Sequence, residues 1–407
     1  MHVIVGVFGL VVFLLLAYLP THNVAMLKKK APYIIGMLAI QFVLGLIMLK
    51  TPVGQNVIDW LSRGFKNLLG FAHEGTAFVF GGLVDYNKDP SGPGPFFMNV
   101  LLPIIVISSL IGILQFLKLL PLIIKYLGLA LSKVTGMPKL ESFNAVSSAI
   151  IGQSENFIAI KKILPTLPPN RLYTLSASAM STVSMSIVGS YMTMIEPRYV
   201  VAAIVLNLFG AFIVVSLLNP YEVAPEDDVF AAPEQKKQSF FEMLGEYIMD
   251  GAKVALTVAA MLIGFVALLA LVNGLFAWVF GGTTFQDVLG YVFAPLAWLT
   301  GVPWSESVQA GEIMATKLVS NEFVAMMSFT EMNPSGSGPV VMSERATAIV
   351  QTFLVSFANF SSIGIIAGAA KSLAPEQGDQ IAKFGLKLLY GATLVSFISA
   401  TVVGLIS

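Results

Sequence analysis

The sequence predicts an all-α polytopic membrane protein, and its composition supports that fold class. Of the 407 residues, 56% are hydrophobic and 11% are charged, whereas soluble proteins carry about 25% charged residues. The mean hydropathy is +0.82, and several apolar runs approach the ~20 residues that cross a bilayer as a helix. Lysine plus arginine equals aspartate plus glutamate at 23 each, so there is no basic surface for nucleic acid. Cysteine is absent and the three histidines are scattered, which argues against disulfides, metal sites and a bound cofactor.

Unbroken apolar runs predict the spanning helices. These runs are Val3–Pro20, Ile34–Leu49, Met98–Leu117, Val200–Leu218, Val254–Phe280 and Leu386–Ile406. The first has no positively charged leader and no small-residue cleavage site, so we expect a retained helix rather than a signal peptide. Lys118, Lys125 and Lys133 recur among leucines at spacings that place them on one helix face. Residues 118–135 therefore predict a helix lying in the membrane interface, in preference to an ordinary spanning helix.

The segments between these runs carry most of the remaining polar residues. Residues 51–97 are polar and glycine-rich, with a clear loop at Asp85–Pro95. Residues 219–246 predict a charged loop, and an amphipathic stretch extends from Phe280 to about residue 300. If the N-terminus lies outside, most of the 23 lysines and arginines fall in inner loops or at inner helix ends. We therefore expect both termini to face outward.

Four further apolar segments are interrupted by polar residues. They are 141–166, broken at Gly152–Glu155; Leu172–Met194, broken at Ser181–Ser186; Ser305–Met327, which contains Glu312, Lys317, Asn321 and Glu322; and Thr347–Ala370, broken at Ser356–Ser362. The arms of 141–166 are too short to cross, so it predicts a re-entrant hairpin with its polar tip near the midplane. A glutamate at that depth is costly unless it faces a wet cavity or a partner. The alternative, Glu155 in a loop outside the membrane, is disfavoured by its short apolar flanks.

The broken segments form an internal repeat. A broken hairpin, a broken helix and a clean helix follow one another twice along the chain. Three crossings separate the two hairpins, so the second hairpin enters from the opposite side and the repeats are inverted. Short or interrupted segments at corresponding positions of two halves are the best sequence indication of a transporter binding site.

The interrupted segments supply a specific set of polar groups. The set consists of Gln153, Ser154, Glu155, Glu322, Asn359 and Ser362. Two carboxylates without an arginine argue against an anionic substrate and suit a neutral solute rich in hydroxyl and N–H groups. Unpaired carboxylates also suit a coupling cation or proton. Phe357 and Phe360 flank Asn359 and could stack on a flat ring, although Phe360 is the better candidate for lipid exposure or core packing.

Three motifs, in this order and at this spacing, resemble the concentrative nucleoside transporter family. They are Gly152-Gln153-Ser154-Glu155, Asn321-Glu322-Phe323-Val324-Ala325 and Phe357-Ala358-Asn359-Phe360-Ser361-Ser362-Ile363-Gly364. The longer strings Lys139–Phe157 and Met180–Met194 are similar to its bacterial NupC-type nucleoside permease branch. The resemblance covers nearly the whole chain.

The resemblance implies an architecture and an assembly. It implies eight transmembrane helices, two opposed re-entrant hairpins, an elevator mechanism and a homotrimer in the bacterial cytoplasmic (inner) membrane. Residues 1–138 would form scaffold helices 1–3 and the interfacial helix. Residues 139–218 and 303–407 would form the two repeats of the transport domain. Residues 219–302 would supply a cytoplasmic loop, a scaffold helix and an amphipathic helix.

The resemblance also implies roles for the polar groups. Gln153, Ser154 and Glu155 would contact the base of a nucleoside such as uridine or adenosine. Glu322, Asn359 and Ser362 would hold the ribose hydroxyls, and Ile187 and Phe357 would pack against the base. Ser154 stands where many members have threonine, and the hydroxyl is retained.

One departure from the family bears on the coupling ion. Sodium-coupled members have an asparagine ligand five residues before the glutamine, and this chain has Ser148 there. The other ligands implied by the resemblance are present: the carbonyls of Ile151, Val183 and Ile187 and the hydroxyl of Thr182. Losing a strong oxygen ligand weakens a sodium site, so we expect a symporter coupled to H+ rather than Na+. Glu155 is the proton-binding candidate.

Rival functions remain open at this point. A sodium-coupled nucleoside symporter has the same architecture. An intramembrane enzyme with Glu155 as base would need a nucleophile or a metal, and the membrane core offers no cysteine or histidine. A passive channel is disfavoured by the paired broken hairpins, which favour alternating access. A dicarboxylate transporter is disfavoured by the missing arginine.

Overall fold

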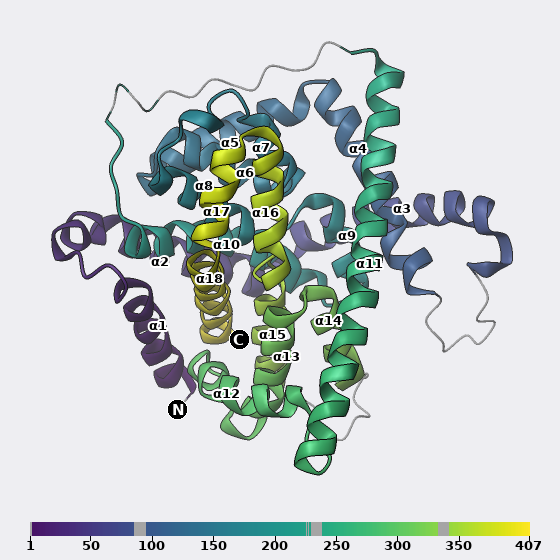
Figure 1. Cartoon of the computed structure of the whole chain (residues 1–407). Helices are drawn as coiled ribbons and strands as arrows, with labels where there is room; N and C mark the ends of the chain where they lie inside the picture. Colours follow the sequence, from purple (N-terminus) through teal and green to yellow (C-terminus); the bar gives the residue numbers. More distant parts are fainter. Residues whose placement is uncertain (1, 85–94, 225, 227, 229–237, 333–341) are drawn as a thin grey trace.

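The computed structural model describes residues 2–84, 95–224, 226, 228, 238–332 and 342–407, and within these ranges it is helical with no strand (Figure 1). Residues 85–94 of the predicted loop, Lys88 among them, lie outside the described ranges. Five helices of the described part are long and apolar enough to cross a membrane. They are α2 (Val24–Lys50), Phe97–Phe116 with α4 (Pro103–Phe116), α10 (Pro197–Leu218), α11 (Phe240–Phe280) and α18 (Gly385–Ile406). A shorter apolar helix, α1 (His2–Tyr18), precedes them, so all six unbroken runs are confirmed as helices.

The region after α2 differs from the sequence prediction. Helix α2 begins at Val24, ten residues before the expected start at Ile34, and most of the predicted polar segment 51–97 is the 29-residue helix α3 (Pro52–Phe80). The Thr51 side chain accepts a hydrogen bond from the Gly54 backbone N–H and caps α3. One buried stripe on α3, at Gly54, Ile58, Phe65, Ala72 and Thr76, explains the error, because the glycines and polar residues obscured an amphipathic helix.

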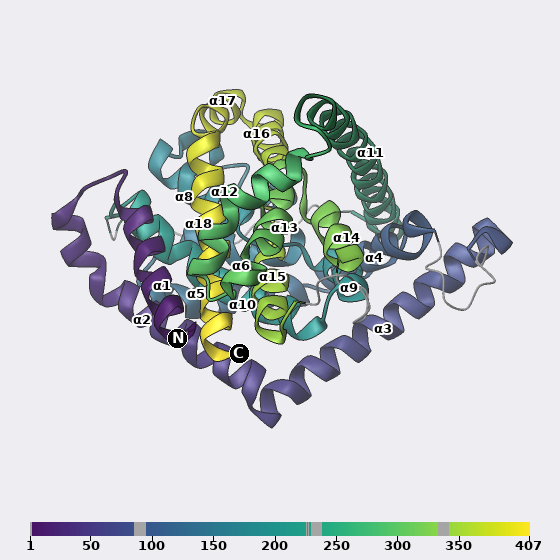
Figure 2. The same ribbon diagram turned by 90° about the horizontal axis from the view of Figure 1, so that it is seen from below.

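A close approach of two backbones shapes the joint between α2 and α3. A Cβ atom on Gly54 would lie 2.0 Å from the carbonyl oxygen of Ile47, so the turn requires glycine. The two helices form the arms of a V along one edge of the molecule (Figure 2).

Helix α11 is also longer than the sequence predicted. It begins at Phe240, within the predicted charged loop 219–246, and has 41 residues, about 60 Å at ~1.5 Å per residue. The Ser239 and Glu242 side chains each bind the other residue's backbone N–H. This capping box explains why α11 begins at Phe240, inside the segment that the sequence predicted as a loop. The predicted amphipathic stretch is confirmed as helix α12 (Phe285–Leu299).

The four interrupted segments are confirmed as broken pairs of helices. The pairs are α6 (Lys139–Ile151) with α7 (Glu155–Ala159), α8 (Pro169–Met180) with α9 (Met185–Met194), α13 (Ser307–Val319) with α14 (Glu322–Met332), and α15 (Glu344–Leu354) with α16 (Phe360–Leu373). Each break falls at the polar residues that the sequence singled out. Residues 118–135 form helix α5 (Leu119–Thr135), and α17 (Pro375–Lys383) was not anticipated.

Hydrogen bonds join the breaks to one another and to their neighbours. The Phe357 N–H, in the α15–α16 break, donates to the Thr182 carbonyl, in the α8–α9 break, at 3.1 Å. The Asn207 side chain on α10 donates to the Val355 carbonyl at 2.8 Å. Backbone groups freed by an interrupted helix must find partners when water is absent. The two breaks therefore meet each other in the middle of the fold.

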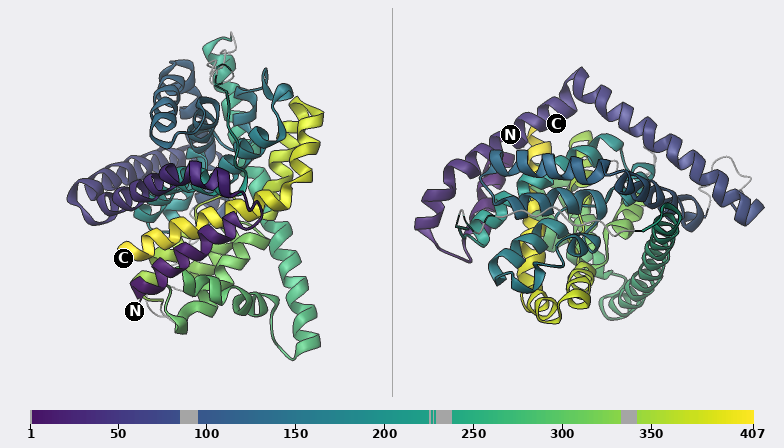
Figure 3. Two further views of the ribbon diagram at one scale, coloured as in Figure 1. Left: turned by 90° about the vertical axis from the view of Figure 1, so that its left-hand side faces the viewer. Right: turned by 90° about the horizontal axis from the view of Figure 1, so that it is seen from above.

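The first and last helices lie antiparallel. The Tyr390 hydroxyl, near the start of α18, donates to the Leu16 carbonyl, near the end of α1, at 2.7 Å. The two chain ends accordingly lie close together (Figures 1 and 3). Helix α2 packs on α10, where buried Gln41 donates to the Leu206 carbonyl at 2.7 Å, and α4 packs on α11.

Candidate functional site

A buried carboxylate stands at the junction of three elements. Glu322 is the first residue of α14, and 4% of it is exposed. Its carboxylate accepts hydrogen bonds from the Tyr191 hydroxyl on α9 at 2.7 Å and from the Asn359 side-chain amide at 3.0 Å. A buried charge is tolerated when hydrogen bonds replace its hydration, as they do here.

The Asn359 side chain is held in one orientation. Asn359 is the N-cap of α16, and its carbonyl oxygen accepts from the Ser362 backbone N–H at 2.9 Å and from the Ser361 hydroxyl at 2.6 Å. These bonds point the amide NH2 group at Glu322. Capping of α16 and orientation of the site are thus the same interaction.

Gln153 connects this cluster to the first half of the chain. Its side-chain amide donates to the Ser362 hydroxyl at 3.4 Å. Its amide oxygen is buried and has no hydrogen-bond partner within the described residues. Five residues from two halves of the chain therefore form one hydrogen-bonded series: Glu322, Tyr191, Asn359, Ser362 and Gln153.

Glu155 and Ser154 lie beside this series rather than in it. Glu155 is exposed and Ser154 half-buried, and both stand where α7 begins. The break is held by Gly152 at φ +121°, and a Cβ atom there would lie 2.5 Å from a Glu155 carboxylate oxygen. Glu155 thus folds back over the break and faces α11, where Asp250 is its electrostatic neighbour.

The apolar residues in and around the predicted site differ in how far they are exposed. Ile187 on α9 and Phe357 in the α15–α16 break are 6% and 5% exposed, whereas Phe360 is 45% exposed. This confirms that Phe360, not Phe357, is the outward-facing ring.

The residues of the predicted weak sodium site lie on α6, at the α8–α9 break and in the first turn of α9. Ser148 is buried, and neither its hydroxyl nor that of Ser147 has a hydrogen-bond partner in the described part of the chain. The Thr182 hydroxyl reaches the Ala179 carbonyl at a long 3.4 Å. Val183 and Ile187 are buried and Ile151 is half-buried. Buried oxygens without partners are costly, so this region can accept a water or a cation.

Tyr191 was missed by the sequence analysis. It lies one helical turn after Ile187, on the same face of α9, and that i, i+4 spacing is the signal that could have found it.

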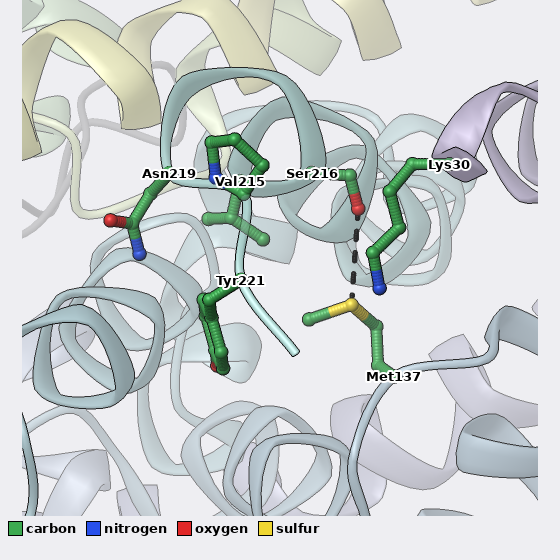
Figure 4. Close-up of a pocket in the computed structure, with 7 residues that line it drawn as sticks. Lys30, Met137, Val215, Ser216, Asn219 and Tyr221 are labelled. Atoms are coloured by element: carbon green, nitrogen blue, oxygen red, sulfur yellow. Dashed lines mark hydrogen bonds between the residues drawn. The ribbon is translucent and has the colours of Figure 1, made fainter. Parts of the chain in front are cut away.

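A hollow elsewhere in the molecule contains none of these residues. Its cavity volume is about 10 Å³, close to the least that holds one water molecule and far below the ~300 Å³ at which small-molecule pockets begin. Its lining includes Lys30, Met137, Val215, Ser216 and Tyr221 (Figure 4). The Ser216 hydroxyl points at the Met137 sulfur, 3.8 Å away, and occupies part of the space. This hollow is too small to hold a polar solute of substrate size.

A polar cluster at the meeting point of broken helices, in a polytopic membrane protein, defines a membrane transporter. Three family models match: "Na+ dependent nucleoside transporter N-terminus" at residues 8–83, "Nucleoside recognition" at 97–198 and "Na+ dependent nucleoside transporter C-terminus" at 199–404. The chain belongs to the concentrative nucleoside transporter family. This family consists of transporters and not of enzymes, so the intramembrane enzyme is set aside.

Relatives and solved structures agree with this assignment. The purine nucleoside transport protein NupG of Bacillus subtilis is 34% identical over 409 residues, covering 100% of this chain and 99% of the relative. The nucleoside permease NupC of Helicobacter pylori is 32% identical, covering 98% and 97%. The structure of CNTnw in an inward-facing substrate-bound state superposes with a TM-score of 0.92 at 29% identity, covering 100% and 99%.

Proposed function

We propose that this protein is a symporter that imports nucleosides across the bacterial cytoplasmic membrane, driven by a cation gradient. The cluster of Glu322, Asn359 and Ser362 is the observation that carries the proposal. A carboxylate offers about four acceptor positions, and among the described residues the side chains of Tyr191 and Asn359 take two of them. The remaining positions suit the paired hydroxyls of a ribose. The named activities of the NupG and NupC relatives support the same substrate class.

Each half of the chain binds a different part of the nucleoside. Glu322, Asn359 and Ser362 bind the ribose, while Gln153, Ser154 and Glu155 contact the base. The unpartnered Gln153 amide oxygen is available to accept a base N–H within the part of the chain described. Ile187 and Phe357 form the apolar walls on which the base packs.

The coupling ion is a proton bound by Glu155. Support comes from Ser148, a short hydroxyl in place of a stronger ligand, and from the open position of Glu155 at the tip of the first half. Sodium is the second candidate. The unpartnered hydroxyls of Ser147 and Ser148, in the described part of α6, favour it, because oxygens are the ligands of hard cations.

The crossings number eight in this proposal. They are α1, α2, the run ending with α4, the broken pair α8–α9, α10, α11, the broken pair α15–α16 and α18. The pairs α6–α7 and α13–α14 are opposed re-entrant hairpins of an inverted repeat, and both termini face outward. An impermeant label should reach Lys161 and Lys371 only from the cytoplasm and Lys88 only from outside. Labelling of Lys88 and Lys161 from one side would disprove both the hairpins and the inversion.

The chain divides into a mobile transport domain, which contains both repeats, and a static scaffold. Residues 139–218 and 303–407 form a transport domain that moves as an elevator against a scaffold of 1–138 and the helix within 219–302, in a homotrimer surrounded by lipid. Within 1–138, α1 and α2 pack on α18 and α10 of the transport domain. An alternative boundary therefore lets α1 and α2 travel with it and leaves α3, α4 and α11 as scaffold.

The test is uptake of labelled uridine and adenosine into proteoliposomes under imposed pH or sodium gradients. One charge crossing 100 mV supplies about 2.3 kcal/mol. At about 1.4 kcal/mol per decade this sustains a roughly fifty-fold gradient of substrate. Accumulation of unmodified nucleoside against its gradient supports the symporter. Equilibration without accumulation would indicate a channel, and transport of dicarboxylates instead would overturn the substrate assignment.

A further inference from the structure

Lys317 is a fully buried lysine in the last turn of α13, with an exposed fraction of 0%. Its ammonium donates to the Phe353 carbonyl at 2.6 Å, to the Ser356 hydroxyl at 2.6 Å and to the Ser396 hydroxyl at 3.3 Å. It also lies 4.5 Å from the centre of the Phe353 ring. An ammonium has three donors, and here each has an oxygen acceptor while the ring face adds a cation–π contact.

The oxygens around Lys317 come from separate elements that converge on one point. Phe353 belongs to the last turn of α15, Ser356 to the α15–α16 break and Ser396 to α18. The two serine hydroxyls are themselves 2.8 Å apart. The carbonyl end of a helix carries partial negative charge, so a cation at the end of α15 is favoured. These neutral oxygens form the kind of cage that holds a small cation, and the lysine fills it.

The break that Lys317 holds contains Asn359 of the proposed ribose site. Phe357 also lies within it, and the Asn359 side chain donates to Glu322 at the start of α14. Lys317 and Glu322 are also electrostatic neighbours across the tip of the second half. Lys317 therefore acts on the substrate through the break and not by contact.

The first half has the same arrangement of helices. Glu141 near the start of α6 binds Arg171 near the start of α8 at 2.6 Å. Asn144, one turn further, donates to the Leu175 carbonyl at 3.0 Å and to the Ser178 hydroxyl at 3.1 Å. Helices α6 and α8 therefore run parallel. In the second half, Glu306 accepts from Ser343 just before α15 at 2.9 Å. Together with the Lys317 contacts, this shows that α13 and α15 run parallel too.

The two halves differ at the last turn of the first helix. Ser148 lies one turn beyond Asn144 on the same face of α6, which directs it toward the α8–α9 break. Its buried hydroxyl has no partner in the described residues, whereas the last turn of α13 holds the Lys317 ammonium among three oxygens. At this turn the second half carries the positive charge of Lys317. The first half has hydroxyl oxygens there, and they have no hydrogen-bond partner among the described residues.

We propose that the Lys317 ammonium is a built-in cation, which gives the second half a fixed positive charge at the turn where the first half has the unpartnered hydroxyl of Ser148. This inference rests on the proposed symport function and deepens it. The second half contributes no coupling ion, and its ribose site is positioned permanently. Lys317 is a positioning residue.

The test replaces the charge in two ways. Lys317→Met keeps most of the length of the side chain but removes the charge and offers no oxygen. Lys317→Asn empties the cage and adds an oxygen ligand. Uridine uptake into proteoliposomes is measured in NaCl, KCl or choline chloride under the same pH gradient.

We expect the uptake by Lys317→Met to be at least tenfold lower than that of the wild type in every salt. We expect Lys317→Asn to be equally low in choline and to recover at least threefold in one of the small-cation salts, beyond any response of the wild type. The control Lys371→Met, at an exposed lysine paired with Asp379, should behave as the wild type.

A second measurement is independent of transport. The thermal midpoint of purified Lys317→Asn should rise with NaCl or KCl relative to choline chloride, and by more than the wild type does. If Lys317→Asn protein can be purified in folded form only when NaCl or KCl is present, that outcome supports the built-in cation in the same way as the rise of the midpoint. Two results would overturn the built-in cation. One is uptake by Lys317→Met at the wild-type level. The other is a Lys317→Asn protein whose uptake, folding and thermal midpoint do not depend on any of the cations. Absence of nucleoside uptake by the wild type would overturn the proposed function instead, and the midpoint of Lys317→Asn would still decide the role of Lys317.

Discussion

The side-chain amide of Asn359 donates to the carboxylate of Glu322 at 3.0 Å, and this contact joins two broken helix pairs of one half of the chain. The same asparagine caps α16, so the geometry of the binding group and the start of the helix cannot vary independently. A site built in this way is rigid before substrate arrives, which lowers the entropic cost of binding.

Glu322→Gln should lower nucleoside uptake at least tenfold without unfolding the protein. The change removes the charge and turns a donor toward the Asn359 amide. A hydrogen bond to a charged group contributes about 1.5–3 kcal/mol, or roughly one to two decades in affinity. The measurement is KM and maximal rate of uridine uptake. The loss should be smaller for 2′- and 3′-deoxy substrates, which lack one of the bonds already. Glu331→Gln, at an exposed position of the same helix, is the control. Normal uridine transport by Glu322→Gln would show that the site assignment is wrong.

Tyr191→Phe should raise KM for ribonucleosides several-fold while leaving the fold intact. The ring stays in its buried place, but Glu322 loses the donor at 2.7 Å, and its carboxylate is less well fixed. The Tyr126→Phe exchange, at a 60% exposed ring, removes a hydroxyl of no expected consequence. Uptake kinetics of both variants decide the matter. Equal KM values for the two would mean that Tyr191 only fills space.

Uptake should be driven by an inward proton gradient and be nearly indifferent to sodium. Glu155→Gln mimics the protonated carboxyl permanently, so it should still bind nucleoside but lose accumulation that depends on pH. Ser148→Asn restores the stronger oxygen ligand and should move the protein toward sodium dependence. These variants are compared in proteoliposomes with and without a protonophore. Strong sodium stimulation of the unmodified protein, with no response to the protonophore, would refute proton coupling and leave the nucleoside assignment standing.

Glu141→Gln should destabilise the first half of the protein strongly. The Glu141 carboxylate is fully buried and binds Arg171 at 2.6 and 2.8 Å and the Tyr221 hydroxyl at 2.8 Å. Removing one partner of a buried ion pair costs about 3–5 kcal/mol, because the other charge stays buried. Asp379→Asn breaks the exposed pair with Lys371 and should cost less than about 1 kcal/mol. Thermal midpoints in detergent compare the two, and similar shifts would contradict a structural role for the buried pair.

The sequence identified the unbroken helices and all four breaks, because hydrophobicity and its interruption are local properties. It also selected Glu322, Asn359, Ser362 and Gln153, because polar residues inside apolar segments are rare enough to stand out. It failed at α3 and at the start of α11. In both places an amphipathic or capped helix carries polar residues that a count of composition assigns to loops.

Only the tertiary structure decided which of these groups meet. The sequence gives Lys317, Glu322 and Tyr191 no relation to one another, since their contacts depend on how α9, α13, α14 and α18 pack. The tertiary structure brings Tyr191 onto Glu322 and closes three oxygens around Lys317, while Glu155 remains beside the series and faces α11. Periodicity fixes the face on which a side chain lies, and the crossing of helices distant in sequence fixes what that face touches.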